Sequence, residues 1–123
     1  MSGVKSFQPK RGMIADFNSE PIKGHETGKT RPCVIVSNNL YNAKLSVIQV
    51  VPITAWTVKK SQILTNIVLN TNKENGLSKK SIADCLQTRP VDYPSRYIRT
   101  RGSLGDRIMQ QIDEALKIVF ALD

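Results

Sequence analysis

Apolar residues in this chain fall into short runs that polar, glycine-containing or proline-containing stretches separate. The runs have the length and the valine and isoleucine content of β-strands. Strands are expected over residues 12–17, 32–37, 45–53 and 63–69, with shorter ones around 81–85 and 88–91. Asn75-Gly76 is a strong turn signal, and Pro94-Ser95 is expected to interrupt the chain.

The hydrophobic period changes near the C-terminus. Apolar side chains there recur every three or four positions, which predicts an amphipathic helix over residues 104–122. Ser103 and Asp106 are expected to cap its N-terminus. Many short strands and one terminal helix favour a mainly β, α+β fold with a small, strongly curved sheet or barrel. We expect a single domain over residues 1–123, with residues 1–10 as a loose tail.

Composition and charge narrow the function. The 123 residues include 18 Lys+Arg against 10 Asp+Glu, a net charge of +8, which favours nucleic acid as the first partner and an acidic protein as the second. Cys33 and Cys85 lie far apart in apolar contexts and are expected to be reduced core residues of a cytoplasmic protein. No zinc-type spacing and no membrane-length apolar run occurs, so neither a metal, a cofactor nor a membrane is expected.

Two polar loops, over residues 18–30 and 55–62, are predicted beside adjacent strand ends. Arg31 stands at the base of the first, and its guanidinium could stabilise a developing phosphate charge; the alternative is an ordinary surface ion pair. Thr54 stands at the base of the second, where its hydroxyl could donate to phosphate or could simply favour a strand. His25 and Glu26 are either proton-transfer groups or a solvated pair.

The loops also carry features of nucleic-acid binding. Trp56 beside Lys59 and Lys60 fits a stacking ring next to phosphate contacts, although the ring could equally cover the end of the sheet. Gly24 and Gly28-Lys29-Thr30 have the wrong spacing for a P-loop, and a strand follows where that motif needs a helix. RNA can be cut without metal, because its 2′-OH attacks the neighbouring phosphate when an acid, a base and a cation are supplied.

At these residues the chain resembles the MazF/PemK/Kid family of bacterial toxins. The matching segments are Arg11-Gly12, Asp16, Pro21-x-x-Gly24-x-Glu26, Lys29-x-Arg31-Pro32-x-Val34-Ile35-Val36-Ser37-Asn38, Val51-Pro52-Ile53-Thr54, Gly76-Leu77, Ser81, Gln87-x-Arg89-x-Val91-Asp92 and Gly102-x-Leu104. They cover nearly the whole chain in order. Met13 stands where the family usually has Asp, and four residues separate Asp16 from Pro21 where two are usual.

The resemblance implies an SH3-like β-barrel of the CcdB/PemK type with a C-terminal helix, working as a homodimer. It implies a growth-inhibiting toxin that is a metal-independent, sequence-specific endoribonuclease of single-stranded mRNA, controlled by a cognate antitoxin. Arg31 and Thr54 match catalytic residues, Glu26 matches a loop glutamate that is catalytic in some members, and Gln87 matches a base contact.

Basic residues complete the expected substrate site, and two alternatives stay open. His25, Lys29, Trp56, Lys59, Lys60, Gln87 and Arg89 are the expected substrate-binding residues. One alternative is a non-catalytic RNA-binding module. The other is a gyrase-poisoning toxin of the same barrel fold.

Overall fold

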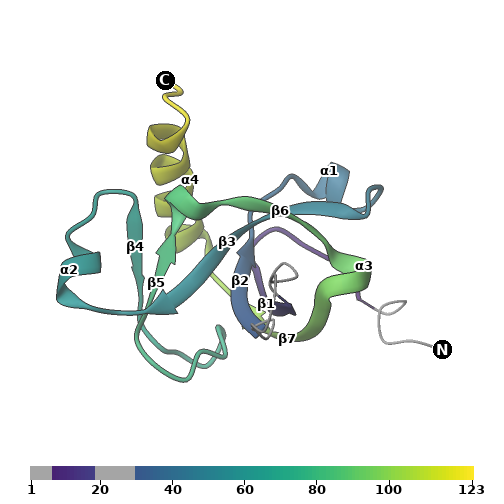
Figure 1. Ribbon diagram of the computed structural model, residues 1–123, viewed down its shortest axis with the longest axis horizontal. Helices are drawn as coiled ribbons and strands as arrows, with labels where there is room; N and C mark the ends of the chain where they lie inside the picture. The colour runs from purple at the N-terminus through teal and green to yellow at the C-terminus, as the bar shows by residue number, and fades with distance from the viewer. Residues whose placement is uncertain (1–6, 19–29) are drawn as a thin grey trace, which may run out of the picture.

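The computed structural model describes residues 7–18 and 30–123, and these form one antiparallel sheet with a helix at its C-terminal end (Figure 1). The strands are β1 (Met13–Asn18), β2 (Thr30–Ile35), β3 (Val47–Ala55), β4 (Asn66–Leu69), β5 (Ser81–Asp84), β6 (Arg89–Asp92) and β7 (Tyr97–Ser103). The helical segments are α1 (Asn39–Asn42), α2 (Val58–Ser61), the 3-10 turn η2 (Cys85–Gln87), α3 (Tyr93–Arg96) and α4 (Asp106–Val119).

The mainly β fold with a C-terminal helix is confirmed, and of the two expected forms, a curved sheet or a barrel, the described residues form the sheet, which does not close on itself. Its strand order is β4-β5-β3-β2-β1-β7, and β6 pairs with the first half of β3. Among the described residues no pairing joins the edge strands β4 and β7. The four-residue β4 instead lies beside α4, which also packs against η2, so a helix covers the core where a closing strand pair would lie.

Alternation along the strands gives the sheet two buried faces. One face carries Ile14, Val34 and Val51 and packs against the apolar stripe of α4, formed by Met109, Ile112 and Ala115. The other face has its own cluster, made of Phe7, Ala15, Phe17, Cys33, Ile35, Ile48, Val50 and Val91. Because side chains alternate with a period of two, adjacent residues of β1, β2 and β3 point into different clusters, and a one-residue slip would exchange them.

The N-terminal residues that the structure describes are packed against the sheet. Phe7 is buried and stacks on Tyr97 with ring centroids 3.8 Å apart, and it meets Tyr93 edge-on. The segment expected to be a loose tail thus has residues 1–6 outside the described ranges and an aromatic anchor at residue 7. Within those ranges, no helix combines the length and the apolar character needed to cross a membrane.

Three local expectations change. The third strand extends to Ala55, so Pro52, expected to close it, lies inside it opposite Cys33, and Thr54, expected at its end, is a strand residue. Strand β7 was not predicted, because its sequence YIRTRGS has few apolar residues. Helix α4 begins after Gly105 with no side-chain cap, so the cap expected from Ser103 and Asp106 is absent.

A close contact between two backbones fixes β7 against the loop that precedes β5. Gly76 adopts a left-handed conformation with φ +65°, and a Cβ on Gly102 would lie 2.0 Å from the Glu74 carbonyl oxygen. The backbone N–H of Ser103 donates to that same carbonyl at 2.8 Å. Only glycine allows this approach, which places Arg101 beside the Gly76 loop.

We therefore expect Gly102→Ala to reduce stability by about 1–3 kcal/mol, because its methyl group would overlap backbone atoms that cannot rotate away. Urea denaturation measures the change. Gly105→Ala is the matched control, since a Cβ at Gly105 would meet nothing within 4 Å. Equal effects of the two substitutions would contradict the close approach.

Candidate functional site

The pairing of β2 with β3 brings Arg31 and Thr54 to the same place. The last paired residues are Cys33 and Pro52, and Arg31 and Thr54 each lie two residues beyond that pair. Residues two apart on a strand point to the same side, so the antiparallel register directs both side chains to one face where the strands separate. Arg31 is exposed and Thr54 is half-buried.

Arg31 and Thr54 line a pocket of about 320 Å³. Its lining residues are Arg31, Pro32, Ile53, Thr54, Ala55, Leu77, Ser78, Lys79, Ser81 and Arg101. Three of them are cationic, three carry hydroxyl groups, and none is acidic. Within the described ranges no ion pair or hydrogen bond reaches the Arg31 guanidinium. Such a pocket is suited to an anion with several oxygen acceptors.

Lys60 fixes the hydroxyl of Thr54. Its Nζ donates to Thr54 Oγ1 at 3.1 Å and to the Ala55 carbonyl at 3.5 Å. Lys60 sits on α2, whose N-cap residue Thr57 accepts from the Lys60 backbone N–H, and Asn66 Nδ2 donates to the Lys60 carbonyl. Because the ammonium occupies an acceptor position on Oγ1, the hydroxyl proton of Thr54 stays available for a ligand.

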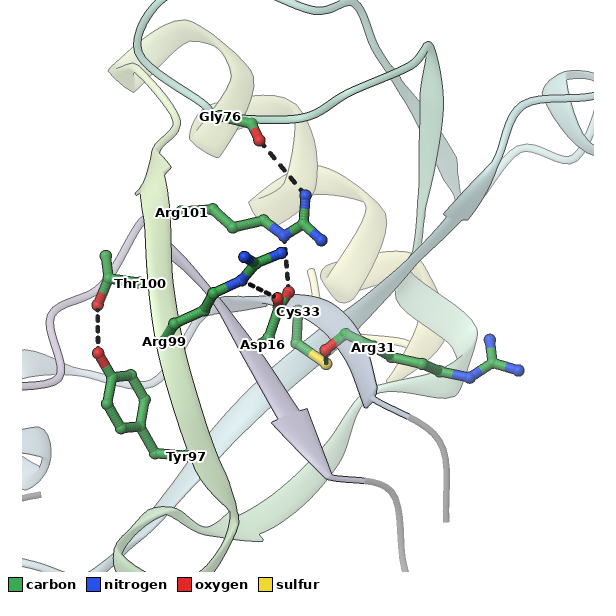
Figure 2. Close-up of polar contacts among 8 residues, drawn as sticks. All are labelled: Asp16, Arg31, Cys33, Gly76, Tyr97, Arg99, Thr100 and Arg101. Atoms are coloured by element: carbon green, nitrogen blue, oxygen red, sulfur yellow. Dashed lines mark hydrogen bonds and ion pairs between the residues drawn. The ribbon is translucent and has the colours of Figure 1, made fainter. Parts of the chain in front are cut away.

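A buried carboxylate, Asp16, binds two arginines of β7, one of which, Arg101, lines the pocket (Figure 2). Asp16 is 1% exposed; its Oδ1 accepts from Arg101 Nε and its Oδ2 from Arg99 Nε, both at 2.7 Å. Arg101 also reaches the Gly76 carbonyl at 3.4 Å. Figure 2 shows the Arg31 side chain extending away from Asp16. The two arginines that line the pocket, Arg31 and Arg101, therefore come from different strands, β2 and β7.

The family model described as "PemK-like, MazF-like toxin of type II toxin-antitoxin system" matches residues 10–120. The chain belongs to this family.

Named relatives agree with that assignment. Endoribonuclease EndoA of Bacillus subtilis is 30% identical over 113 residues, which are 92% of this chain and 95% of EndoA. Endoribonuclease MazF9 of Mycobacterium tuberculosis is 32% identical over 114 residues, covering 89% and 93% of the two chains. A structure of MazE-MazF from Deinococcus radiodurans has a TM-score of 0.77 at 20% identity, covers 95% of this chain and 99% of that one, and supports the fold.

Of the other expected site residues, His25, Glu26 and Lys29 lie outside the described ranges. The remaining ones lie at the end of β3, on α2 and around β6. Trp56 directly follows β3, and its ring lies under Lys80 Nζ at 4.3 Å, a cation–π contact with a lysine that the sequence reasoning did not select. Lys59 is exposed on α2.

Gln87 and Arg89 lie outside the pocket, in the segment that leads into β6 and pairs with the first half of β3. Gln87 ends η2, and Arg89 begins β6 opposite Val50, so neither lines the pocket. Arg89 nonetheless lies close enough to Cys33 to lower that thiol's pKa, as Arg31 also does. Arg31 and Arg89 thus both act electrostatically on the same β2 residue, Cys33.

Sequence reasoning missed Arg101, Arg99 and Lys79. Arg101 and Arg99 lie on the unpredicted strand β7, and Lys79 precedes β5. One signal was present: the two arginines are two residues apart, the spacing that puts both side chains on one face of a strand.

Burial dominates the chemistry of Cys33. It raises the thiol pKa to about 12, against the opposing effect of Arg89 and Arg31 and with a smaller increase from Asp16. Cys85 is also buried, and its pKa is likewise raised to about 12. Both thiols therefore stay protonated in the folded chain at pH values where an unfolded chain, with a pKa of 9.0, ionises.

Folding should consequently lose stability as pH rises above 9, because the unfolded state releases a proton that the folded state keeps. For Cys33 the loss between pH 8 and pH 10 is on the order of 1 kcal/mol. Urea denaturation of the wild type and of Cys33→Ala at both pH values measures it. The variant should show a smaller loss; identical pH dependences would refute the assigned burial effect.

Proposed function

We propose that this chain is a metal-independent, sequence-specific endoribonuclease, the toxin of a type II toxin–antitoxin pair, which cuts single-stranded mRNA and so inhibits translation and growth. The observation that carries the proposal is that Arg31 and Thr54 line one cationic pocket without an acidic lining residue. Family membership and the endoribonuclease names of EndoA and MazF9 support the same activity.

The chemistry uses the ribose itself as the nucleophile. The 2′-oxygen bonds to the adjacent phosphorus and gives its proton to a base, the bond from phosphorus to the 5′-oxygen breaks, and that oxygen takes a proton. The products are a 2′,3′-cyclic phosphate and a 5′-hydroxyl. Arg31 stabilises the charge on the phosphorane oxygens, and the Thr54 hydroxyl donates a second hydrogen bond to them.

Glu26 is proposed as the residue that moves protons, with His25 beside it as a substrate contact and the alternative proton carrier. Lys60 serves the reaction through Thr54, because its contact with Oγ1 fixes the direction of the hydroxyl. This gives Lys60 a positioning function in addition to its proposed substrate contact.

The proposed substrate contacts extend from the pocket along the sheet. Lys29, Lys59 and Arg89 neutralise phosphates, Trp56 offers a stacking surface, and Gln87 reads a base. Since most of these contacts are ionic, affinity should fall as salt concentration rises.

The proposed assembly is a cytoplasmic homodimer that a cognate antitoxin protein restrains. The family description, which names toxins of type II toxin–antitoxin systems, supports the antitoxin. The homodimer and the cytoplasmic location follow from the resemblance and from two reduced, buried cysteines.

The deciding experiment incubates the purified chain with a long mixed-sequence transcript in excess EDTA. We expect cleavage at one short sequence, with 2′,3′-cyclic phosphate and 5′-hydroxyl ends, and no cleavage when the residue before the cut carries a 2′-deoxyribose. Intact RNA that binds tightly would favour the non-catalytic binding module. Intact RNA together with inhibited DNA gyrase supercoiling would favour the gyrase poison.

Arg31→Ala and Thr54→Val should each lower the single-turnover cleavage rate by about 10²–10³-fold, because each removes a donor to the developing charge. Thr54→Ser, which keeps the hydroxyl, should recover most of the rate. Arg107→Ala on the exposed surface of α4 removes the same charge as Arg31→Ala and should cut normally. Normal cleavage by Arg31→Ala would exclude the proposed role of Arg31.

A further inference from the structure

Asp16 is a charged residue in a position where an apolar one would normally lie. It belongs to β1, whose burial runs unbroken from Ile14 to Phe17, and its side chain is 2% exposed. Burying a carboxylate costs more free energy than burying an apolar side chain of similar size, even with a partner. The charge therefore needs a reason other than stability.

The arrangement of its two partners supplies that reason. Each carboxylate oxygen accepts one hydrogen bond, and each bond comes from an arginine Nε, so the terminal nitrogens are not used by Asp16. For Arg101 one terminal nitrogen faces the Gly76 carbonyl, and the other has no partner among the described residues. One carboxylate cannot neutralise two guanidinium groups, so the cluster keeps a net positive charge.

The two arginines differ in what they face. Arg101 lines the pocket that Arg31 and Thr54 share, and its side chain is 22% exposed. Arg99 does not line that pocket, and its side chain is 64% exposed. The pocket volume of about 320 Å³ is in the range of sites that hold a small organic ligand. The pocket is therefore large enough for more than one phosphate group.

We propose that Arg101 is a second phosphate-binding residue of the pocket, which engages a phosphate next to the one at Arg31, and that Asp16 is the residue that positions it. The proposal deepens the proposed function, since it names a subsite for the same RNA strand. The Nε contact with Asp16 and the contact with Gly76 hold the guanidinium plane in place, so little side-chain freedom is lost when a phosphate binds.

The test is equilibrium binding of a fluorescent 2′-O-methyl RNA oligonucleotide of mixed sequence, which cannot be cleaved because its attacking hydroxyl is blocked. Binding is measured over a series of salt concentrations. Arg101→Gln should weaken binding and reduce the slope of log affinity against log salt by about 0.7, the value for one lost phosphate contact to a single strand. Arg99→Gln is the matched control, because it removes the same charge and the same Asp16 partner outside the pocket.

Asp16→Asn tests whether Asp16 acts by positioning Arg101 or only through its negative charge. It removes a negative charge near an anion site, so charge alone predicts tighter binding. If Asp16 positions Arg101, binding should instead weaken, with a salt slope like that of Arg101→Gln. In cleavage, both variants should raise KM more than they lower kcat, because the groups on the scissile phosphate are intact. Thermal denaturation of each variant identifies any that fail to fold, and Arg101→Gln then decides alone.

The outcomes are distinct from those of the proposed function. A wild type that binds the oligonucleotide but leaves RNA intact would refute the nuclease activity, while the salt slopes still test the subsite. Equal slopes for Arg101→Gln and Arg99→Gln, or tighter binding by Asp16→Asn, would overturn the subsite in a chain that cuts RNA normally.

Discussion

The pairing of β2 with β3 is the constraint on which the site depends. These strands are buried on both faces between Cys33 and Ile35, so a slip of one residue would exchange the two apolar clusters and expose one of them. The same register puts Arg31 and Thr54 two residues beyond the last pair, at the point where the strands separate. The hydrophobic core therefore sets the position of two polar residues that contribute nothing to it.

The pocket is positively charged because its lining residues include three cations and no acidic residue. Its cations come from β2, β7 and the loop before β5, and no lining residue is acidic. Asp16 lies inside the sheet, and its carboxylate contacts the Nε of Arg99 and of Arg101. It can hold Arg101 firmly without covering the nitrogens that face the pocket.

The strands with apolar alternation and the terminal helix could be read from the sequence because their patterns follow directly from burial. Strand β7 could not, since one of its faces carries Arg99 and Arg101 and its partner is β1, far away along the chain. Arg31 and Thr54 were found from their positions next to apolar runs. Arg101 was missed because its importance depends on a buried carboxylate and on a glycine contact, and neither leaves a periodic signal.

The pocket also shows how a stable fold can hold groups that repel one another. Arg31, Lys79 and Arg101 share one cavity, and like charges brought together disfavour the folded state. The close approach of Gly102 to the Glu74 backbone and the contact of Arg101 with Asp16 resist a movement of β7 away from the pocket. An anion bound in the pocket, as proposed for the RNA phosphates, would relieve this repulsion and gain affinity from it. A rigid backbone contact and one buried carboxylate thus keep three cations together in a pocket that carries no acidic lining residue.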